Sequence, residues 1–243
     1  MRNIQDALYK GRKVTLIENL IYGELGQAVL RLHNERFKGT SLEIKKEFEP
    51  NKVLAHSNIG NISFNERLRE LGVPIHVLSP EEMVIYWKAI KDPNTYTDSD
   101  SLSVYPNPGP NEDRRQEALS IVGIQNPEQP YLVSGIDLAP NGEGYKLVGT
   151  DHVNVRPAHF LIHDCRVKYD PETKSIVKTT NDDQEGIQIY TSQDQSGLRG
   201  AFRVRSDRLD FGGDDLLCSS DDGRVQVLCE PQAHTKNLEA KAV

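Results

Sequence analysis

The side chains best suited to chemistry lie together in residues 151–167, DHVNVRPAHFLIHDCRV. This stretch holds three histidines, two aspartates and a cysteine, which are residue types that ligate metals and transfer protons. The candidate ligands are His152, His159, His163 and Cys165. The stretch is therefore the first place to look for a metal site or an acid/base site.

The geometry of a strand limits what this stretch can bind. In an extended strand His159, His163 and Cys165 share one face, and residues four apart lie about 13 Å from each other at ~3.3 Å per residue. Both histidines cannot hold one zinc ion through bonds of about 2.0–2.3 Å. His163 and Cys165 could chelate together with ligands from another strand. A helix starting at Pro157 would instead place the two histidines one turn apart. The hairpin pattern that follows favours the strand, with structural histidines.

Glu43-Ile44-Lys45 is the second candidate site. In metal-dependent nucleases a strand carries Glu-x-Lys, where the carboxylate binds the metal and the lysine helps to activate water. Alternating Glu and Lys is also what the solvated face of a strand looks like, and this interpretation is favoured here.

Two further groups of charged residues favour structural interpretations. Arg203 and Arg205 are predicted to share the outward face of a strand, with Phe202 and Val204 toward the core. Residues 98–100, Asp-Ser-Asp, resemble part of a calcium loop but lack its glycine and its final glutamate. The three cysteines have no CxxC spacing, so free thiols are expected.

Residues 1–92 are predicted to form a mixed α/β module, because helix caps and short apolar runs alternate along them. The expected elements are a helix from a capping box at Thr15 and Glu18 to about Phe37, a half-buried strand over 41–48, a helix from Ser63 to Gly72, a strand over Ile75–Leu78, and a helix from Ser79 to about Lys91.

The composition changes after this module. Residues 93–111 carry four prolines and almost no apolar periodicity, which predicts a linker or surface arm. Residues 112–243 are predicted to form a β-rich domain that begins with a helix over Glu112–Val122. The expected strands and hairpins are Leu132–Leu138 with Tyr145–Gly149, Arg166–Asp170 with Lys174–Lys178, Ile187–Tyr190, Ala201–Arg205, and Leu216–Ser219 joined to Val225–Leu228 across Asp222-Gly223. The predicted fold class is α+β, an N-terminal mixed α/β unit followed by a β-rich sandwich or barrel.

Composition narrows the classes of partner. The net charge of −7 provides no general attraction to nucleic acid, so no nucleic-acid partner is expected. No apolar run reaches the ~18 residues that span a bilayer, and the N-terminus has no secretory pattern. The expected location is the cytoplasm or a virion, without secretion or a membrane partner.

No complete catalytic constellation emerges from these patterns. The sequence therefore predicts a non-catalytic structural or interaction protein, a subunit of a larger assembly such as a viral particle, with protein partners or further copies of itself. No catalytic residue and no cofactor are assigned. Two alternatives stay open: a metal-dependent hydrolase or nuclease using Glu43 and Lys45 or a His163/Cys165 site, and a small-molecule-binding β-barrel.

Overall fold

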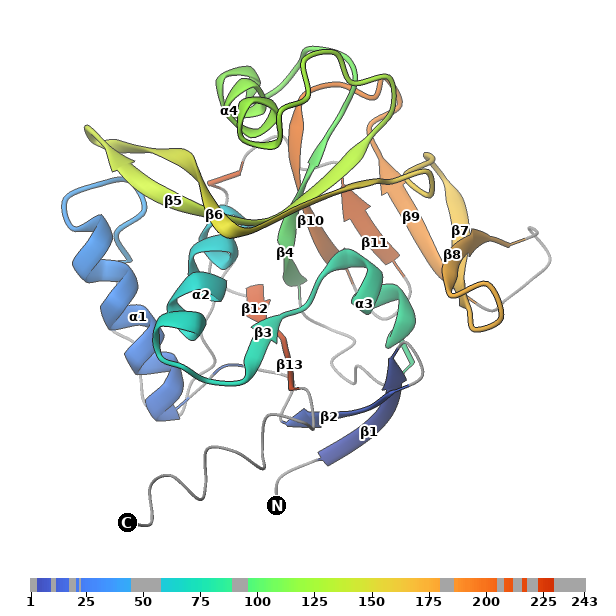
Figure 1. Ribbon diagram of the computed structural model, residues 1–243, viewed down its shortest axis with the longest axis horizontal. Coiled ribbons are helices and arrows are strands. Elements are labelled where there is room, and N and C mark those ends of the chain that lie inside the picture. The colour runs from blue at the N-terminus through green and yellow to red at the C-terminus, as the bar shows by residue number, and fades with distance from the viewer. Residues whose placement is uncertain are drawn as a thin grey trace.

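The chain folds around a large, open and mostly antiparallel sheet, with helices and a smaller sheet packed beside it (Figure 1). The structure, a computed structural model, describes residues 4–9, 12–17, 21, 23–44, 58–88, 96–179, 186–204, 208–211, 216–217 and 223–229. The helices are α1 (Gly23–Phe37), α2 (Asn58–Glu70), α3 (Pro80–Ile85) and α4 (Glu112–Val122). The strands are β1 (Ile4–Tyr9), β2 (Arg12–Ile17), β3 (Ile75–Val77), β4 (Tyr96–Val104), β5 (Tyr131–Asn141), β6 (Gly144–Pro157), β7 (Cys165–Asp170), β8 (Ser175–Lys178), β9 (Ile187–Thr191), β10 (Leu198–Val204), β11 (Arg208–Phe211), β12 (Gly223–Val225) and β13 (Val227–Cys229).

The predicted α+β class is confirmed, but no barrel is found. The large sheet runs β6-β5-β4-β10-β11-β9-β7-β8, with β12 paired beside β4, and its described strands do not close on themselves. The smaller sheet runs β1-β2-β13-β3. Among the described residues, no helix is long and apolar enough to cross a membrane.

Several local predictions are confirmed because turn and cap chemistry acts within a few residues. Helix α4 spans the predicted residues and ends at Gly123, whose φ of 70° is the left-handed conformation that favours glycine. The β5–β6 and β7–β8 hairpins form where the Pro-Asn-Gly and Pro-Glu-Thr turns predicted them.

Helix α1 begins later than its sequence pattern predicted. Residues 15–17, assigned to the helix, instead belong to β2, which pairs with β1. Helix α1 starts at Gly23, and its buried side consists of Gly26, Val29, His33 and Phe37. A strand followed closely by a helix produced an apolar spacing that imitates one longer helix.

A buried histidine joins α1 to α2. The His33 ring packs against Phe37 and Phe64, with centroid distances of 4.8 and 5.2 Å. Its Nε2 donates to the Leu42 carbonyl at 2.8 Å, and the Ser63 hydroxyl donates to Nδ1 at 3.1 Å. Burial lowers the pKa of His33 to about 4. Ser63 therefore lies inside α2 as a core hydrogen-bond donor, and the helix start predicted there is wrong.

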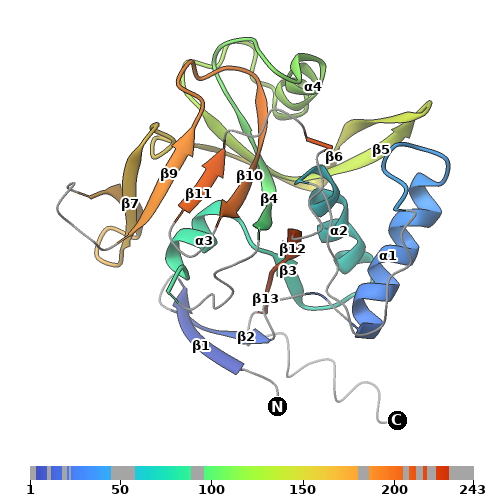
Figure 2. The same ribbon diagram turned by 180° about the vertical axis from the view of Figure 1, so that it is seen from behind.

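Strand β4 lies within the segment predicted as a linker, and that prediction is wrong for its residues (Figure 2). It pairs with β10 on one side, and with β5 over Leu102–Val104 and β12 over Tyr96–Asp98 on the other. Residues 97–104 are all buried. The polar sequence TDSDSLS concealed a core strand, because strand prediction relies on apolar residues.

An irregularity divides β4 into two halves. Gly200 pairs with Leu102 and Phe202 with Asp98, so residues 99–101 lie opposite Ala201 alone. The Ser99 hydroxyl bonds to the backbone of Ser101, and the Asp100 N–H donates to the Leu78 carbonyl at 3.1 Å. The irregular residues thus satisfy their polar groups locally and connect β4 to the segment before α3.

Charged side chains are also buried in the core. Arg203 is 1% exposed, whereas Phe202 and Val204 are partly exposed, so the predicted outward face of Arg203 is wrong. The reason is that β10 is an inner strand contacted by helices, where the rule for half-exposed strands does not apply. Arg205 lies outside the described residues. Arg67 of α2 is equally buried and pairs with Asp137 of β5 at 2.9 Å.

The C-terminal strands differ from the predicted hairpin. Strand β12 runs parallel to β4, whereas β13 pairs with β2 and β3 in the smaller sheet. Leu216 and Leu217, predicted as strand, lie in a turn, and residues 218–222 are outside the described part. Each of the three core clusters contains residues from both sides of 93–111. The first 92 residues therefore have no separate core within the described part of the chain.

Two carboxyl groups of β4 are buried, and they differ in their hydrogen bonding. No described residue donates a hydrogen bond to the Asp98 carboxyl, and burial raises its pKa to about 8. Asp100 accepts from the Ser101 hydroxyl at 2.6 Å. Burial, opposed by this hydrogen bond, raises the pKa of Asp100 to about 6. The folded protein consequently favours the protonated, uncharged form of Asp98.

Replacement of Asp98 by asparagine is expected to stabilise the protein more at pH 8 than at pH 4. The unfolded aspartate has a pKa of about 3.9 and the folded one about 8. The aspartate therefore lowers the free energy of unfolding as the pH rises between these values, at about 1.4 kcal/mol per unit. Thermal unfolding of Asp98→Asn and the parent protein at both pH values measures the difference.

The matched control is Asp151→Asn, which changes an exposed aspartate on β6. A gain in stability from Asp98→Asn that is equal at the two pH values would contradict a buried, protonated Asp98.

Candidate functional site

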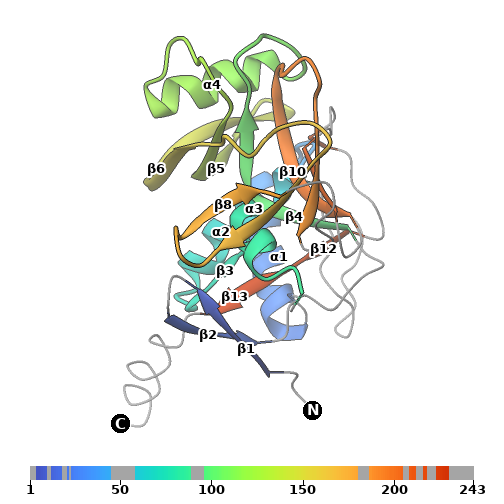
Figure 3. The ribbon, with the colours of Figure 1, turned by 90° about the vertical axis from the view of Figure 1, so that its right-hand side faces the viewer.

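A cavity of about 280 Å³ lies between α3, the end of β6 with the loop after it, and the β7–β8 hairpin. Figure 3 shows α3 close to this end of the large sheet. The polar lining consists of Glu81, Arg156, His159, Lys174 and Ser175. The apolar lining consists of Ile85, Pro157, Phe160, Tyr169 and Ile176. Such a mixture of apolar walls and a few charged groups is typical of small-molecule sites.

Helix α3 holds Glu81 at the cavity through its cap. The predicted capping box is confirmed: Ser79 accepts from the Glu82 N–H, and the Glu82 carboxylate accepts from the Ser79 N–H at 2.9 Å. The other Glu82 oxygen lies 2.9 Å from Nε2 of His76 on β3. Burial opposes ionisation of Glu82, but the His76 and Ser79 hydrogen bonds keep its pKa below the ordinary value. The short helix is thus tied to the smaller sheet.

Arg156 brings a guanidinium to the cavity from the end of β6. Its Nη2 lies 3.1 Å from Oε2 of Glu81. Its Nε is buried and has no hydrogen-bond acceptor in the part of the chain that the structure describes. Glu81 is the acceptor that this guanidinium has among the described residues, so its Nη1 remains able to donate to a ligand.

The β7–β8 turn places Lys174 at the cavity. Asp170 accepts from the Thr173 hydroxyl at 2.7 Å and from the Glu172 N–H at 2.9 Å. These hydrogen bonds, that of Thr173 first, lower the pKa of Asp170. Lys174 follows in the left-handed conformation, with φ of 54°, and its side chain is exposed. The ordered turn therefore fixes the backbone of Lys174 at the rim of the cavity.

The apolar wall of the cavity is continuous with the core. Phe160 packs edge-to-face on Phe211 of β11 with a centroid distance of 6.4 Å. Ile85 and Ile176 pack against the same core cluster as Phe160. A ligand bound here would therefore meet a wall whose shape is set by core packing.

The histidine-rich stretch divides into three structural parts. Residues 151–157 end β6, residues 158–164 form a loop, and Cys165 begins β7. The predicted strand is wrong for the loop, where Ala158 bonds to Pro130 outside β6 and Leu161 N–H turns back to the Ala158 carbonyl. The chain therefore does not alternate its side chains between two faces there.

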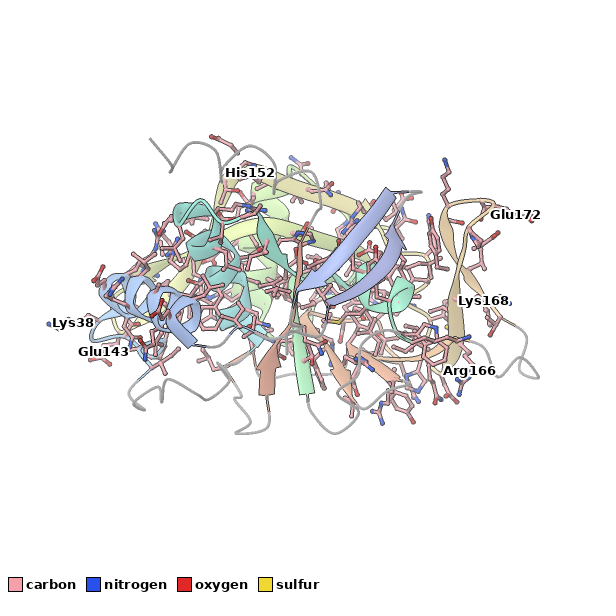
Figure 4. All side chains as sticks on the ribbon, turned by 90° about the horizontal axis from the view of Figure 1, so that it is seen from below. Lys38, Glu143, His152, Arg166, Lys168 and Glu172 are labelled. Atoms are coloured by element: carbon pink, nitrogen blue, oxygen red, sulfur yellow. The ribbon has the colours of Figure 1, made fainter. Side chains whose placement is uncertain are left out.

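The candidate ligands in this stretch do not converge. His152 is exposed on β6 and lies on a different side of the molecule from Lys168 and Glu172 of the β7–β8 hairpin (Figure 4). His163 bonds through Nδ1 to the Thr191 carbonyl and packs against Tyr190. Buried Cys165 donates to the Phe160 carbonyl at 3.8 Å, and burial raises its pKa. His159 lines the cavity.

The Glu43 candidate lies in a turn after α1. Glu43 accepts from the Gly39 N–H at 2.8 Å, and residues 41–44 are turn or irregular, so the predicted strand is wrong over these residues. Lys45 lies outside the described residues, and the nuclease element stays a prediction. Across the described ranges, no group of three His, Cys, Asp or Glu side chains is arranged to hold a metal ion.

His159 is the cavity residue that sequence reasoning proposed as a ligand, and the residues that it missed include Glu81, Arg156, Tyr169 and Lys174. Each lies next to a feature that was predicted, namely the α3 cap, the histidine-rich stretch and the β7–β8 turn. No spacing rule links them, because they come together only when α3 packs against the end of the large sheet.

Comparisons of this chain with protein-family models, with curated proteins and with solved structures gave no match. The geometry of the cavity and its surroundings is therefore the basis for proposing a function.

Replacement of His76 by alanine is expected to lower the free energy of unfolding by about 1–3 kcal/mol at neutral pH, because buried Glu82 loses a donor. The lowered pKa of Glu82 means that its contribution is present above pH of about 4.3 and is lost as the pH falls through the folded value. The effect of His76→Ala should therefore shrink in acid. Chemical denaturation at pH 7 and at low pH measures both.

His159→Ala serves as the control, since His159 is exposed at the cavity. Equal stability of the two alanine variants at neutral pH would show that the His76–Glu82 pair does not hold α3.

Proposed function

We propose that this protein is a non-catalytic binding protein and that its ligand site is the cavity between α3 and the β7–β8 hairpin. The observation that carries the proposal is the combination of unused charged donors on Arg156 and Lys174 with apolar walls. A volume of about 280 Å³ is near the lower limit of small-molecule sites, roughly 300–1,000 Å³.

The distribution of perturbed groups favours binding over catalysis. Asp98, Asp100 and His33 have strongly displaced pKa values because they are buried in the core. None of them lines the cavity. Enzymes tend to place groups with displaced pKa values where the substrate binds. In this chain the groups with displaced pKa values instead lie in the core, Asp98 and Asp100 on β4 and His33 between α1 and α2.

The site differs from the β-barrel interior considered from sequence. Because the large sheet is open, the cavity lies against its end instead of inside a closed barrel. Like the small-molecule-binding barrel predicted as an alternative, this site would hold a small molecule between apolar and polar walls.

A screen of small anionic, neutral and cationic molecules by two-dimensional NMR tests this proposal. At least one class is expected to bind saturably and to shift the amide signals of Phe160, Lys174 and Ile176. Ser175→Trp, which places a large side chain at the exposed rim, is expected to abolish these shifts. The thermal unfolding of that variant should stay within about 1 kcal/mol of the parent protein.

The control is Ser120→Trp, which adds the same side chain to the exposed surface of α4. If no compound binds at the cavity, or if Ser175→Trp leaves binding unchanged, the proposed site is wrong.

A second candidate function is that of a subunit in a larger assembly, with protein partners or further copies of the chain. A surface patch formed by His163, Tyr190 and Arg208, with the exposed Ile162 next to His163 in the chain, supports it. Ile162 and Tyr190 are 43% and 36% exposed. The Tyr190 ring lies 5.0 Å from the His163 ring and 4.0 Å from the Arg208 guanidinium. Tyrosine and arginine are enriched at the energetic centres of protein interfaces.

Size-exclusion chromatography with light scattering tests the assembly role. The protein is expected to self-associate or to retain a partner, and Tyr190→Ser with Ile162→Ser is expected to weaken that association at least tenfold. Leu217→Ser removes an exposed hydrophobic residue outside the patch and serves as the control. A strict monomer at high concentration that captures no partner would contradict this role.

A further inference from the structure

Resting on the proposed binding function, we infer that the cavity takes a small organic carboxylate. Its anionic end would lie against Arg156 and Lys174, and its apolar end against Phe160, Tyr169 and Ile176. Three features of the cavity support this ligand: the unused donors, the net charge of the lining, and the size of the apolar wall.

The donors needed for a carboxylate are already positioned. Arg156 is held by Glu81 through Nη2, and its Nη1 has no acceptor among the described residues. Lys174 is held by the ordered turn and has no described ion-pair partner. A planar guanidinium and an ammonium in the lining of one cavity suit the two oxygens of a carboxylate.

The charge of the lining matches a monoanion. Arg156 and Lys174 contribute two positive charges and Glu81 one negative charge. The excess of one positive charge stands out in a chain whose net charge is −7. A monoanion would neutralise this excess, whereas a dianion such as hydrogen phosphate would leave a negative charge facing Glu81.

The apolar wall and the volume limit the rest of the ligand. A dry cavity of about 150 Å³ is enough for benzene. The present cavity, at about 280 Å³, has room for one substituted ring of this size. Phe160 and Tyr169 provide aromatic faces, and Ile176 an aliphatic one. An aromatic or branched carboxylate therefore fits better than a short polar one.

Glu81 is the residue that sets the affinity for such an anion. Its Oε2 occupies one nitrogen of Arg156 at 3.1 Å, and its charge repels an incoming carboxylate. A Glu81→Gln variant retains the size of the side chain and removes the repulsion. The variant is therefore expected to bind carboxylates more tightly, which a merely structural role of Glu81 would not produce.

Isothermal titration calorimetry with benzoate, benzamide and inorganic phosphate tests the inference. Benzoate is expected to bind with a dissociation constant below about 1 mM, and benzamide and phosphate at least about tenfold more weakly. Arg156→Gln and Lys174→Gln should each weaken benzoate binding by about tenfold or more, and Glu81→Gln should strengthen it several-fold. Lys146→Gln, on the exposed side of β6, should leave it unchanged.

Lys174→Gln keeps the test valid if Arg156→Gln fails to fold, since Lys174 is exposed on a turn. Benzamide or phosphate binding as tightly as benzoate would overturn the carboxylate assignment. Equal benzoate affinities of the Lys174→Gln and Lys146→Gln variants would also overturn it. If benzoate fails while another screened compound still binds and Ser175→Trp blocks it, the ligand class is wrong and the proposed binding function stands. If nothing binds, the binding function fails too.

Discussion

A strand buried between other strands must have its backbone donors and acceptors paired on both edges, and β4 is where this requirement governs the fold. Its residues Leu102–Val104 pair with β5 and β10, and its residues Tyr96–Asp98 pair with β10 and β12. Because β12 continues into β13 of the smaller sheet, the pairing of β4 also brings the two sheets together. The backbone bonds compensate for a side-chain sequence that is almost entirely polar. They do not compensate for the Asp98 carboxyl, which therefore favours the protonated state.

Polar groups also join the helices to the sheet. Oδ2 of Asp137 on β5 forms ion pairs with Nη2 of Arg67 on α2, at 2.9 Å, and with Nη2 of Arg36 on α1, at 3.1 Å. Removing Asp137 would leave the buried Arg67 without this partner, which is destabilising even where the ion pair itself adds little net stability. Near the cavity, Glu82 plays a similar part by linking the cap of α3 to His76. The next residue toward the N-terminus, Glu81, faces the cavity. The core polar network and the cavity wall are thus adjacent along the same short helix.

The candidate site was predictable only in fragments. The cap at Ser79 and the turn at Asp170 follow from residue types within one turn, and both appear in the structure as expected. His159 was noticed for metal chemistry, but it lies at a cavity with Arg156 instead of beside His163. The reason is that residues 158–164 form a loop, so neither strand nor helix spacing describes where those side chains point. Glu81 and Arg156 are far apart in the chain, and no local rule relates them.

The sequence by itself determined the α+β class, helix α4 with its glycine stop, the cap of α3, and the hairpins of β5–β6 and β7–β8. These features depend on interactions within a few residues, whose free energies are nearly independent of the rest of the chain. Tertiary packing decided four other features: the burial of β4, the inward position of Arg203, the pairing of β2 with β1 ahead of a helix that begins only at Gly23, and the cavity. A polar residue can be buried wherever distant strands and helices satisfy its hydrogen bonds, and those partners cannot be identified from sequence spacing.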